Sequence, residues 1–87
     1  MAEVTMYSTG WCPYCARARA LLERKGIAVH EIDIETDAAL RAEMIERSGR
    51  RSVPQIFIDA RHVGGFEELY ALDRSGELAS ILQTEQP

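Results

Sequence analysis

Apolar positions in the 87-residue chain follow two different spacings, and these spacings predict its secondary structure. Short runs rich in β-branched and aromatic residues favour strands, whereas apolar residues that recur every three or four positions favour helices. Strands are predicted over residues 4–7, 27–34, 55–58 and 62–64. Helices are predicted over residues 13–25, 37–48, 67–75 and 77–82. Residues 59–61 form a turn, so the last two strands make a hairpin.

Residues that start or stop helices stand at the ends of the predicted helices. Pro13 suits the first helical turn, because its fixed φ fits there and its missing N–H needs no partner. Thr36 can cap the second helix, while Gly26 and Gly49 can stop the first and the second. The helix residues predicted to face inward are Leu40, Met44, Ile45, Leu69 and Leu72.

The order of these elements is βαβαββα with a short final helix, which is the order of the thioredoxin fold. We therefore expect an α/β protein with a four-stranded mixed sheet flanked by helices. A chain of 87 residues, of which 46% are hydrophobic, has room for one compact domain with a modest core. We expect a single domain over residues 1–87, with the polar residues 83–87 as a frayed tail.

The charge pattern and the first residues exclude several classes of partner. The 14 acidic and 10 basic residues are spread along the chain and give a net charge of −4, so no basic stripe indicates nucleic-acid binding. Residues 1–4 lack the features of a signal peptide, and no apolar run approaches the length of a membrane span. We expect a cytoplasmic protein that binds neither nucleic acid nor membrane.

The two cysteines of the chain, Cys12 and Cys15, stand three residues apart. On a helix, residues i and i+3 share one face, so the two sulfurs can form a reversible disulfide. A zinc site is disfavoured, because structural zinc needs four ligands and His30 and His62 stand alone. Cytosolic thiols stay reduced unless cycling is their purpose, so the pair favours redox exchange over two buried core cysteines.

The predicted helix start gives the two cysteines different roles. Cys12, in the cap position before Pro13, would have unpaired backbone N–H groups and the positive end of the helix dipole at its sulfur. These favour the reactive thiolate, so Cys12 is the predicted nucleophile and Cys15, one turn inside, the resolving thiol. Tyr14 is expected to be exposed beside the sulfurs, with a place in the core as the alternative. For Trp11, partial burial beside the site and plain loop packing stay open.

Ser52, Val53 and Pro54 precede the third predicted strand. A proline at the entrance of a strand is tolerated as an ordinary structural element. Alternatively, a cis Val53–Pro54 bond would turn the Val53 backbone outward and leave its N–H and C=O to pair with an extended peptide-like substrate. The residues alone leave both interpretations open.

Gly64 and Gly65, followed by Phe66, Glu67 and Glu68, join a strand to a helix start. The simpler interpretation is a tight turn whose acidic residues complement the helix dipole. The functional interpretation is a ligand pocket, in which helix N–H groups hold an anion and the carboxylates hold an ammonium group. The combination with the cysteine pair is what favours the pocket.

These motifs, placed in this order, resemble those of glutaredoxins, and among them the bacterial glutaredoxin 3 group. The matching segments are Cys12-Pro13-Tyr14-Cys15, Arg47-Ser48-Gly49-Arg50, Ser52-Val53-Pro54-Gln55-Ile56-Phe57-Ile58-Asp59 and Gly64-Gly65. The resemblance implies a thioredoxin fold and glutathione as the reducing co-substrate. It also implies two reactions, the dithiol reduction of protein disulfides and the monothiol removal of glutathione from mixed disulfides. We expect a monomer with no metal and no tightly bound cofactor.

The resemblance also implies a role for each matching residue. Cys12 matches the nucleophile, Cys15 the resolving cysteine and Pro54 the cis-proline of the family. The Val53 backbone matches the group that pairs with the cysteinyl part of glutathione. The glycine pair matches the pocket for its γ-glutamyl end, with Phe66 and Glu67 backbone groups on the carboxylate and a Glu67 or Glu68 side chain near the amine. The predicted glutathione-binding residues are Tyr14, Arg51, Ser52, Val53, Pro54, Gly65, Phe66, Glu67 and Glu68.

Two positions depart from the family pattern. Many members carry Lys where Thr9 stands, and Asp where Glu67 and Glu68 stand. The glycyl carboxylate of glutathione would then lack its usual cation. Our hypothesis is that Arg50 or Arg51 supplies this charge, and the alternative is that the two form a solvated basic pair.

Two other functions are compatible with the same motifs. One is a redoxin that thioredoxin reductase reduces in place of glutathione. The other is an iron–sulfur carrier in which two protomers hold a cluster through Cys12 and glutathione. Pro13 argues against the carrier, because its rigid ring would crowd the cluster side of the site.

Overall fold

The computed structural model describes residues 2–84, in which four strands and four helices follow one another in the predicted order. The strands are β1 (Val4–Ser8), β2 (Val29–Asp33), β3 (Gln55–Ile58) and β4 (Arg61–Gly64). The helices are α1 (Pro13–Arg24), α2 (Ala38–Ser48), α3 (Phe66–Ser75) and α4 (Glu77–Thr84). None of these helices is long and apolar enough to cross a membrane.

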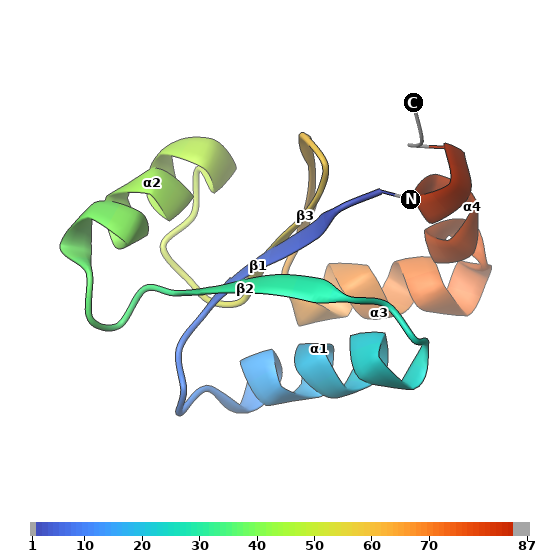
Figure 1. The fold of residues 1–87 in the computed structure, drawn as a ribbon, viewed down its shortest axis with the longest axis horizontal. Coiled ribbons are helices and arrows are strands. Elements are labelled where there is room, and N and C mark those ends of the chain that lie inside the picture. The colour runs from blue at the N-terminus through green and yellow to red at the C-terminus, as the bar shows by residue number, and fades with distance from the viewer. Residues whose placement is uncertain (1, 85–87) are drawn as a thin grey trace.

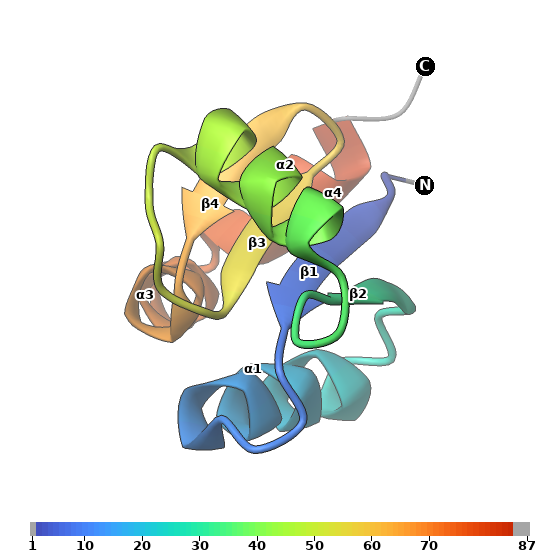
Figure 2. The same ribbon diagram turned by 90° about the vertical axis from the view of Figure 1, so that its left-hand side faces the viewer.

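The strands form one mixed sheet, as predicted, and their order in it is β2-β1-β3-β4. β1 pairs with β2 in parallel through the crossover helix α1, whereas β3 pairs with β1 and β4 in antiparallel fashion. The end of β1, the start of β3 and the end of β4 therefore lie at the same edge of the sheet. The loop that leads into α1, the loop before β3 and the loop into α3 meet at this edge (Figure 1, Figure 2).

Alternating side chains of β1 and β3 divide the interior into two apolar clusters, one on each face of the sheet. The helices α1 and α3 lie against one face and α2 against the other (Figure 1, Figure 2). The buried residues of the first cluster are Val4, Met6, Ala18, Leu21, Leu22, Ile56, Ile58, Leu69, Leu78 and Ile81. Those of the second are Tyr7, Ile34, Met44 and Phe57. The inward direction predicted for Leu40, Met44, Ile45, Leu69 and Leu72 is confirmed, since all five pack in these clusters.

The ends of several elements differ from the predicted ones. The N-cap of α2 is Asp37, not Thr36, and its Oδ1 accepts from the Ala39 N–H at 2.9 Å. The Ile27 N–H donates to the Leu22 carbonyl of α1, so residues 27 and 28 connect α1 to β2 and are not part of the strand. Arg61 belongs to β4 and not to the turn before it.

The first two residues of the predicted tail belong to a helix. The helix α4 continues through residues 83 and 84, which corrects the assignment of these two residues to a frayed tail. Residues 85–87, the rest of that prediction, lie outside the described residues.

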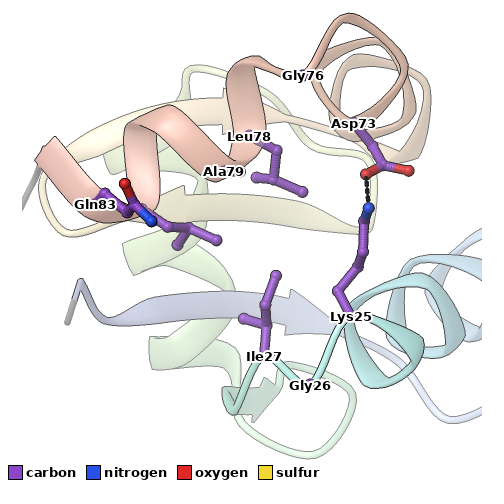
Figure 3. A pocket seen from close by; sticks show the side chains of 9 residues that line it. Lys25, Gly26, Ile27, Asp73, Gly76, Leu78, Ala79 and Gln83 are labelled. Carbon is purple, nitrogen blue, oxygen red and sulfur yellow. Dashed lines mark ion pairs between the residues drawn. The ribbon is translucent and has the colours of Figure 1, made fainter.

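The ends of α1 and α3 and the helix α4 enclose a groove of about 370 Å³ (Figure 3), which lies at the opposite end of α1 from the cysteines. Ile27, Leu78 and Leu82 give it an apolar floor. At its rim, Lys25 Nζ lies 2.7 Å from Asp73 Oδ1, and this ion pair joins the end of α1 to the end of α3.

Candidate active site

The two cysteines lie at the start of α1, directly after the loop that follows β1. Cys12 is the N-cap residue, with φ −80° and ψ 118°, and Pro13 begins the helix. The Cys15 N–H donates to Cys12 Sγ at 3.3 Å. This sulfur therefore accepts a helix N–H and lies at the positive end of the helix dipole. The predicted cap position of Cys12 is confirmed.

The two thiols differ in their environment. Both are free, but Cys15 has no exposed surface, whereas Cys12 is 8% exposed. Burial first, and the hydrogen bond to Cys12 second, raise the pKa of Cys15 to about 12, while a backbone hydrogen bond with Thr9 opposes the rise. Cys15 therefore keeps its proton at neutral pH, which suits a thiol that reacts second.

The loop before β3 lies against the sulfur of Cys12. Cys12 Sγ donates to the Val53 carbonyl oxygen at 3.7 Å. The Val53–Pro54 peptide bond is cis, which confirms the interpretation that the resemblance favoured. The backbone next to the cis bond thus lies beside the sulfur that is the predicted nucleophile.

A groove of about 290 Å³ lies along this loop and the start of α3. The residues that line it are Tyr14, Arg50, Ser52, Val53, Pro54, Gln55, Gly65, Phe66, Glu67 and Glu68. The structure thus brings together eight of the nine residues predicted to bind glutathione. Among residues 2–84, Arg50 lines the groove and Arg51, the ninth, does not.

Gly65 is the N-cap residue of α3, and the Glu68 side chain reaches back to its backbone N–H as the acidic residue of a capping box does. Glu68 Oε1 accepts from the Gly65 N–H at 2.6 Å and lies 3.5 Å from Arg50 Nη1. The hydrogen bond from Gly65 lowers the pKa of the Glu68 carboxyl, and Arg50 adds to this. A side chain at Gly64 would place its Cβ 2.7 Å from Glu68 Oε1, at a φ of +122° that only glycine adopts readily. The Glu68 carboxylate is therefore engaged within the protein, and Glu67 presents its carboxylate at the groove without an ion pair among residues 2–84.

Comparison with known proteins places this site in a family. Residues 4–63 match the family model described as Glutaredoxin. The chain is 55% identical over 83 residues to glutaredoxin 3 of Escherichia coli, a match that covers 95% of this chain and all of that protein. It is 48% identical to a glutaredoxin of Pseudomonas aeruginosa over 94% of this chain and 98% of that one. The chain belongs to the glutaredoxin family.

Solved glutaredoxins share the fold over most of their length. The solution structure of glutaredoxin from Brucella melitensis is 54% identical, has a TM-score of 0.86, and is matched over 100% of this chain and 95% of that one. A crystal structure of a buckwheat glutaredoxin–glutathione complex is 27% identical, with a TM-score of 0.87 over 95% of this chain and 78% of that one. The thioredoxin fold expected from the order of elements is therefore confirmed.

Gln55 is a residue of this glutaredoxin site that the sequence analysis did not assign. Its side chain is 1% exposed and its Nε2 donates to the Ser52 carbonyl at 3.0 Å. Its Oε1 lies 2.8 Å from His62 Nε2, so His62 donates from that nitrogen. Burial and the nearby Arg50 lower the pKa of His62, which favours the neutral ring. The signal in the sequence was a polar residue at the start of an otherwise apolar strand.

The position where many glutaredoxins carry Lys is buried in this member. Thr9 is 7% exposed, and its Oγ1 has no hydrogen-bond partner among residues 2–84. The cation nearest to the groove is instead Arg50, whose side chain is 47% exposed beside Glu68. Of the two arginines in our hypothesis, the geometry favours Arg50.

The aromatic residues beside the cysteines are exposed. Tyr14 is 49% exposed, as predicted, and its ring lies 6.3 Å from that of Phe66. Trp11 is 70% exposed, so its partial burial beside the site is wrong.

Proposed function

We propose that this glutaredoxin is a glutathione-dependent thiol–disulfide oxidoreductase in which Cys12 attacks and Cys15 resolves. The observation that carries the proposal is the asymmetry of the pair. Cys12 Sγ accepts a helix N–H beside the groove, whereas the buried Cys15 keeps its proton. One sulfur is thus prepared to attack and the other to follow.

In the dithiol reaction, the Cys12 thiolate attacks one sulfur of a protein disulfide and forms a mixed disulfide, and the second substrate sulfur leaves and takes up a proton. Cys15 then loses its proton and attacks Cys12 Sγ, which releases the substrate as a dithiol and leaves a Cys12–Cys15 disulfide. Two molecules of glutathione restore the two thiols and become glutathione disulfide. In the monothiol reaction, Cys12 takes glutathione from a mixed disulfide and a second glutathione removes it.

Glutathione would lie in the groove along the loop before β3. The Val53 backbone would pair with its cysteinyl part, because this backbone lies beside Cys12 Sγ. The backbone N–H groups of Phe66 and Glu67 at the start of α3 would face the γ-glutamyl carboxylate, and the Glu67 carboxylate its amine. Arg50 would face the glycyl carboxylate. Support for this ligand comes from the buckwheat relative, whose structure is that of a glutathione complex.

The test measures NADPH consumption with glutathione, glutathione reductase and a small disulfide. Cys12→Ser should abolish turnover of every substrate. Cys15→Ser should keep the removal of glutathione from mixed disulfides and lose most reduction of protein disulfides. Equal loss in both variants would contradict the two roles. Turnover that requires thioredoxin reductase in place of glutathione would favour the redoxin alternative.

The setting of the reaction is part of the proposal. We infer that the protein works in the cytoplasm, where free glutathione keeps a cycling thiol pair reduced. It would act as a monomer without a tightly bound cofactor, because one chain supplies both thiols and the whole groove.

A further inference from the structure

Three aromatic side chains, two exposed tyrosines and a half-buried phenylalanine between them, form a row that leads away from the cysteines along α3. Tyr14, Phe66 and Tyr70 form this row. The Phe66 and Tyr70 rings are stacked, with centroids 5.8 Å apart. Tyr14 and Tyr70 are 49% and 43% exposed, so neither ring is needed to fill the core. Exposed tyrosines gathered in a row are typical of a surface that binds another molecule.

Two arginines flank the aromatic row. The Arg17 guanidinium lies over the Tyr14 ring, 5.2 Å from its centroid. Arg74 lies 5.6 Å from the centroid of Tyr70, and its Nη1 donates to the Tyr70 hydroxyl at 2.9 Å. Neither arginine forms an ion pair within residues 2–84, although the whole chain carries a net charge of −4. The two charges are therefore available to an acidic partner.

The arrangement of the helices fixes the length of the row. α1 and α3 run side by side in the same direction, because Tyr14 meets Phe66 at their starts and Lys25 meets Asp73 at their ends (Figure 3). Phe66, Tyr70 and Arg74 are four residues apart on one face of α3, which places Arg74 about 12 Å from Phe66. An extended polypeptide covers that distance with about four residues.

We propose that this row docks the protein substrate, and that it selects disulfides followed by an apolar residue and then by acidic residues. The inference rests on the proposed function and names the substrate class of that same site. The segment next to the attacked sulfur would lie on Tyr14 and Phe66, and acidic side chains about four residues further along would reach Arg74. A second copy of this chain fits less well, because its arginines would face the same arginines.

The test compares two synthetic peptides that contain the same disulfide-closed ring. The ring is followed by Leu-Ser-Asp-Asp in one peptide and by Leu-Ser-Lys-Lys in the other. At low salt the acidic peptide should have a kcat/KM about tenfold higher, since each exposed ion pair contributes about threefold. Added salt should reduce the difference.

Substitutions in the row test whether it causes the preference for the acidic peptide. Arg74→Glu should lower the preference for the acidic peptide to about threefold or less, and a further Arg17→Glu should remove or invert it. Tyr70→Ser should raise KM for both peptides several-fold with little change in kcat. The matched control is Arg61→Glu, the same charge change on an exposed residue at the hairpin end of β4, which should keep the wild-type preference.

A small probe, bis(2-hydroxyethyl) disulfide with glutathione, separates this inference from the proposed function. All the variants should reduce it at the wild-type rate, because it is too short to reach the row. Equal turnover of the two peptides by the wild type, or an unchanged preference in Arg74→Glu, would overturn the inference while leaving the oxidoreductase intact. Analytical ultracentrifugation would also overturn it if the wild type sedimented as a dimer and Tyr70→Ser as a monomer, since the row would then join two copies. Absence of small-disulfide turnover in the wild type would refute the proposed function itself.

Discussion

Gln55 joins the loop beside Cys12 to the rest of the sheet, and its replacement by leucine tests how much this link contributes. In Gln55→Leu, the bond from Nε2 to Ser52, which is shared between its carbonyl at 3.0 Å and its hydroxyl at 3.3 Å, and the bond to His62 Nε2 at 2.8 Å are both lost. The leucine has a similar volume and fills the same buried place at the start of β3. The substitution therefore removes the hydrogen bonds without opening a large cavity.

The expected effect on stability follows from the two lost bonds. Each neutral hydrogen bond contributes about 1 kcal/mol, and more where the remaining partner is left buried and unpaired. Ser52 is exposed and His62 half-buried, so water can replace part of what Gln55 gave them. The burial of the apolar leucine side chain offsets a further part of the lost stability. We expect the free energy of unfolding to fall by about 1–2 kcal/mol.

A double-mutant cycle in urea measures the Gln55–His62 bond alone. His62→Phe keeps an aromatic ring against Phe57, whose centroid lies 4.9 Å from that of His62. Because both single variants lose the same bond, the double variant should lose about 1 kcal/mol less than their sum. Without the Gln55 bonds the Val53 backbone is held less firmly. The variant should therefore also raise KM for glutathionylated substrates more than it lowers kcat. Additive losses, or an unchanged KM in Gln55→Leu, would refute the view that this chain of bonds positions the loop.

Three further predictions concern pH and helix capping. The folded state lowers the pKa of Glu68 below its ordinary 4.5, so this carboxylate stabilises the fold above about pH 4.5 and the contribution is lost as pH falls through the folded pKa. Urea titrations should show Glu68→Gln less stable than the wild type at pH 6 and equal to it near pH 2. The folded state raises the pKa of Cys15 from 9.0 to about 12, so the folded protein keeps a proton that the unfolded chain gives up. Stability under reducing conditions should fall between pH 9 and 10 by on the order of 1 kcal/mol, and Cys15→Ser should lack this part of the fall. Asp37→Ala should cost about 1 kcal/mol by chemical denaturation, with Thr36→Ala costing clearly less, because Asp37 caps α2.

The fold could be predicted because its determinants are local and periodic. In β1, Val4 and Met6 face one cluster while Tyr7 faces the other, and this alternation is visible in the sequence. The cap of α2 could not be decided in the same way. Thr36 and Asp37 are both residue types that favour the N-cap position. Which of them takes it depends on the backbone conformation of the turn after β2, and residue type alone does not determine that conformation.

The candidate site was predictable where chemistry is concentrated in a short motif, and not where it depends on contacts between distant elements. Cys12 and Cys15 could be assigned because a helix start is readable from Pro13. The Arg74 contact with Tyr70 was open to prediction from their i, i+4 spacing, but its relation to the site depends on how α3 packs beside α1.

The same packing explains why the two cysteines, so close in sequence, are chemically unequal. A single helical turn moves the side chain from the cap, where N–H groups and a groove are available, to the interior beneath the sheet. The spacing of three residues therefore places one sulfur at the helix end, where a backbone N–H donates to it, and the other in the interior, where burial raises the pKa of its thiol.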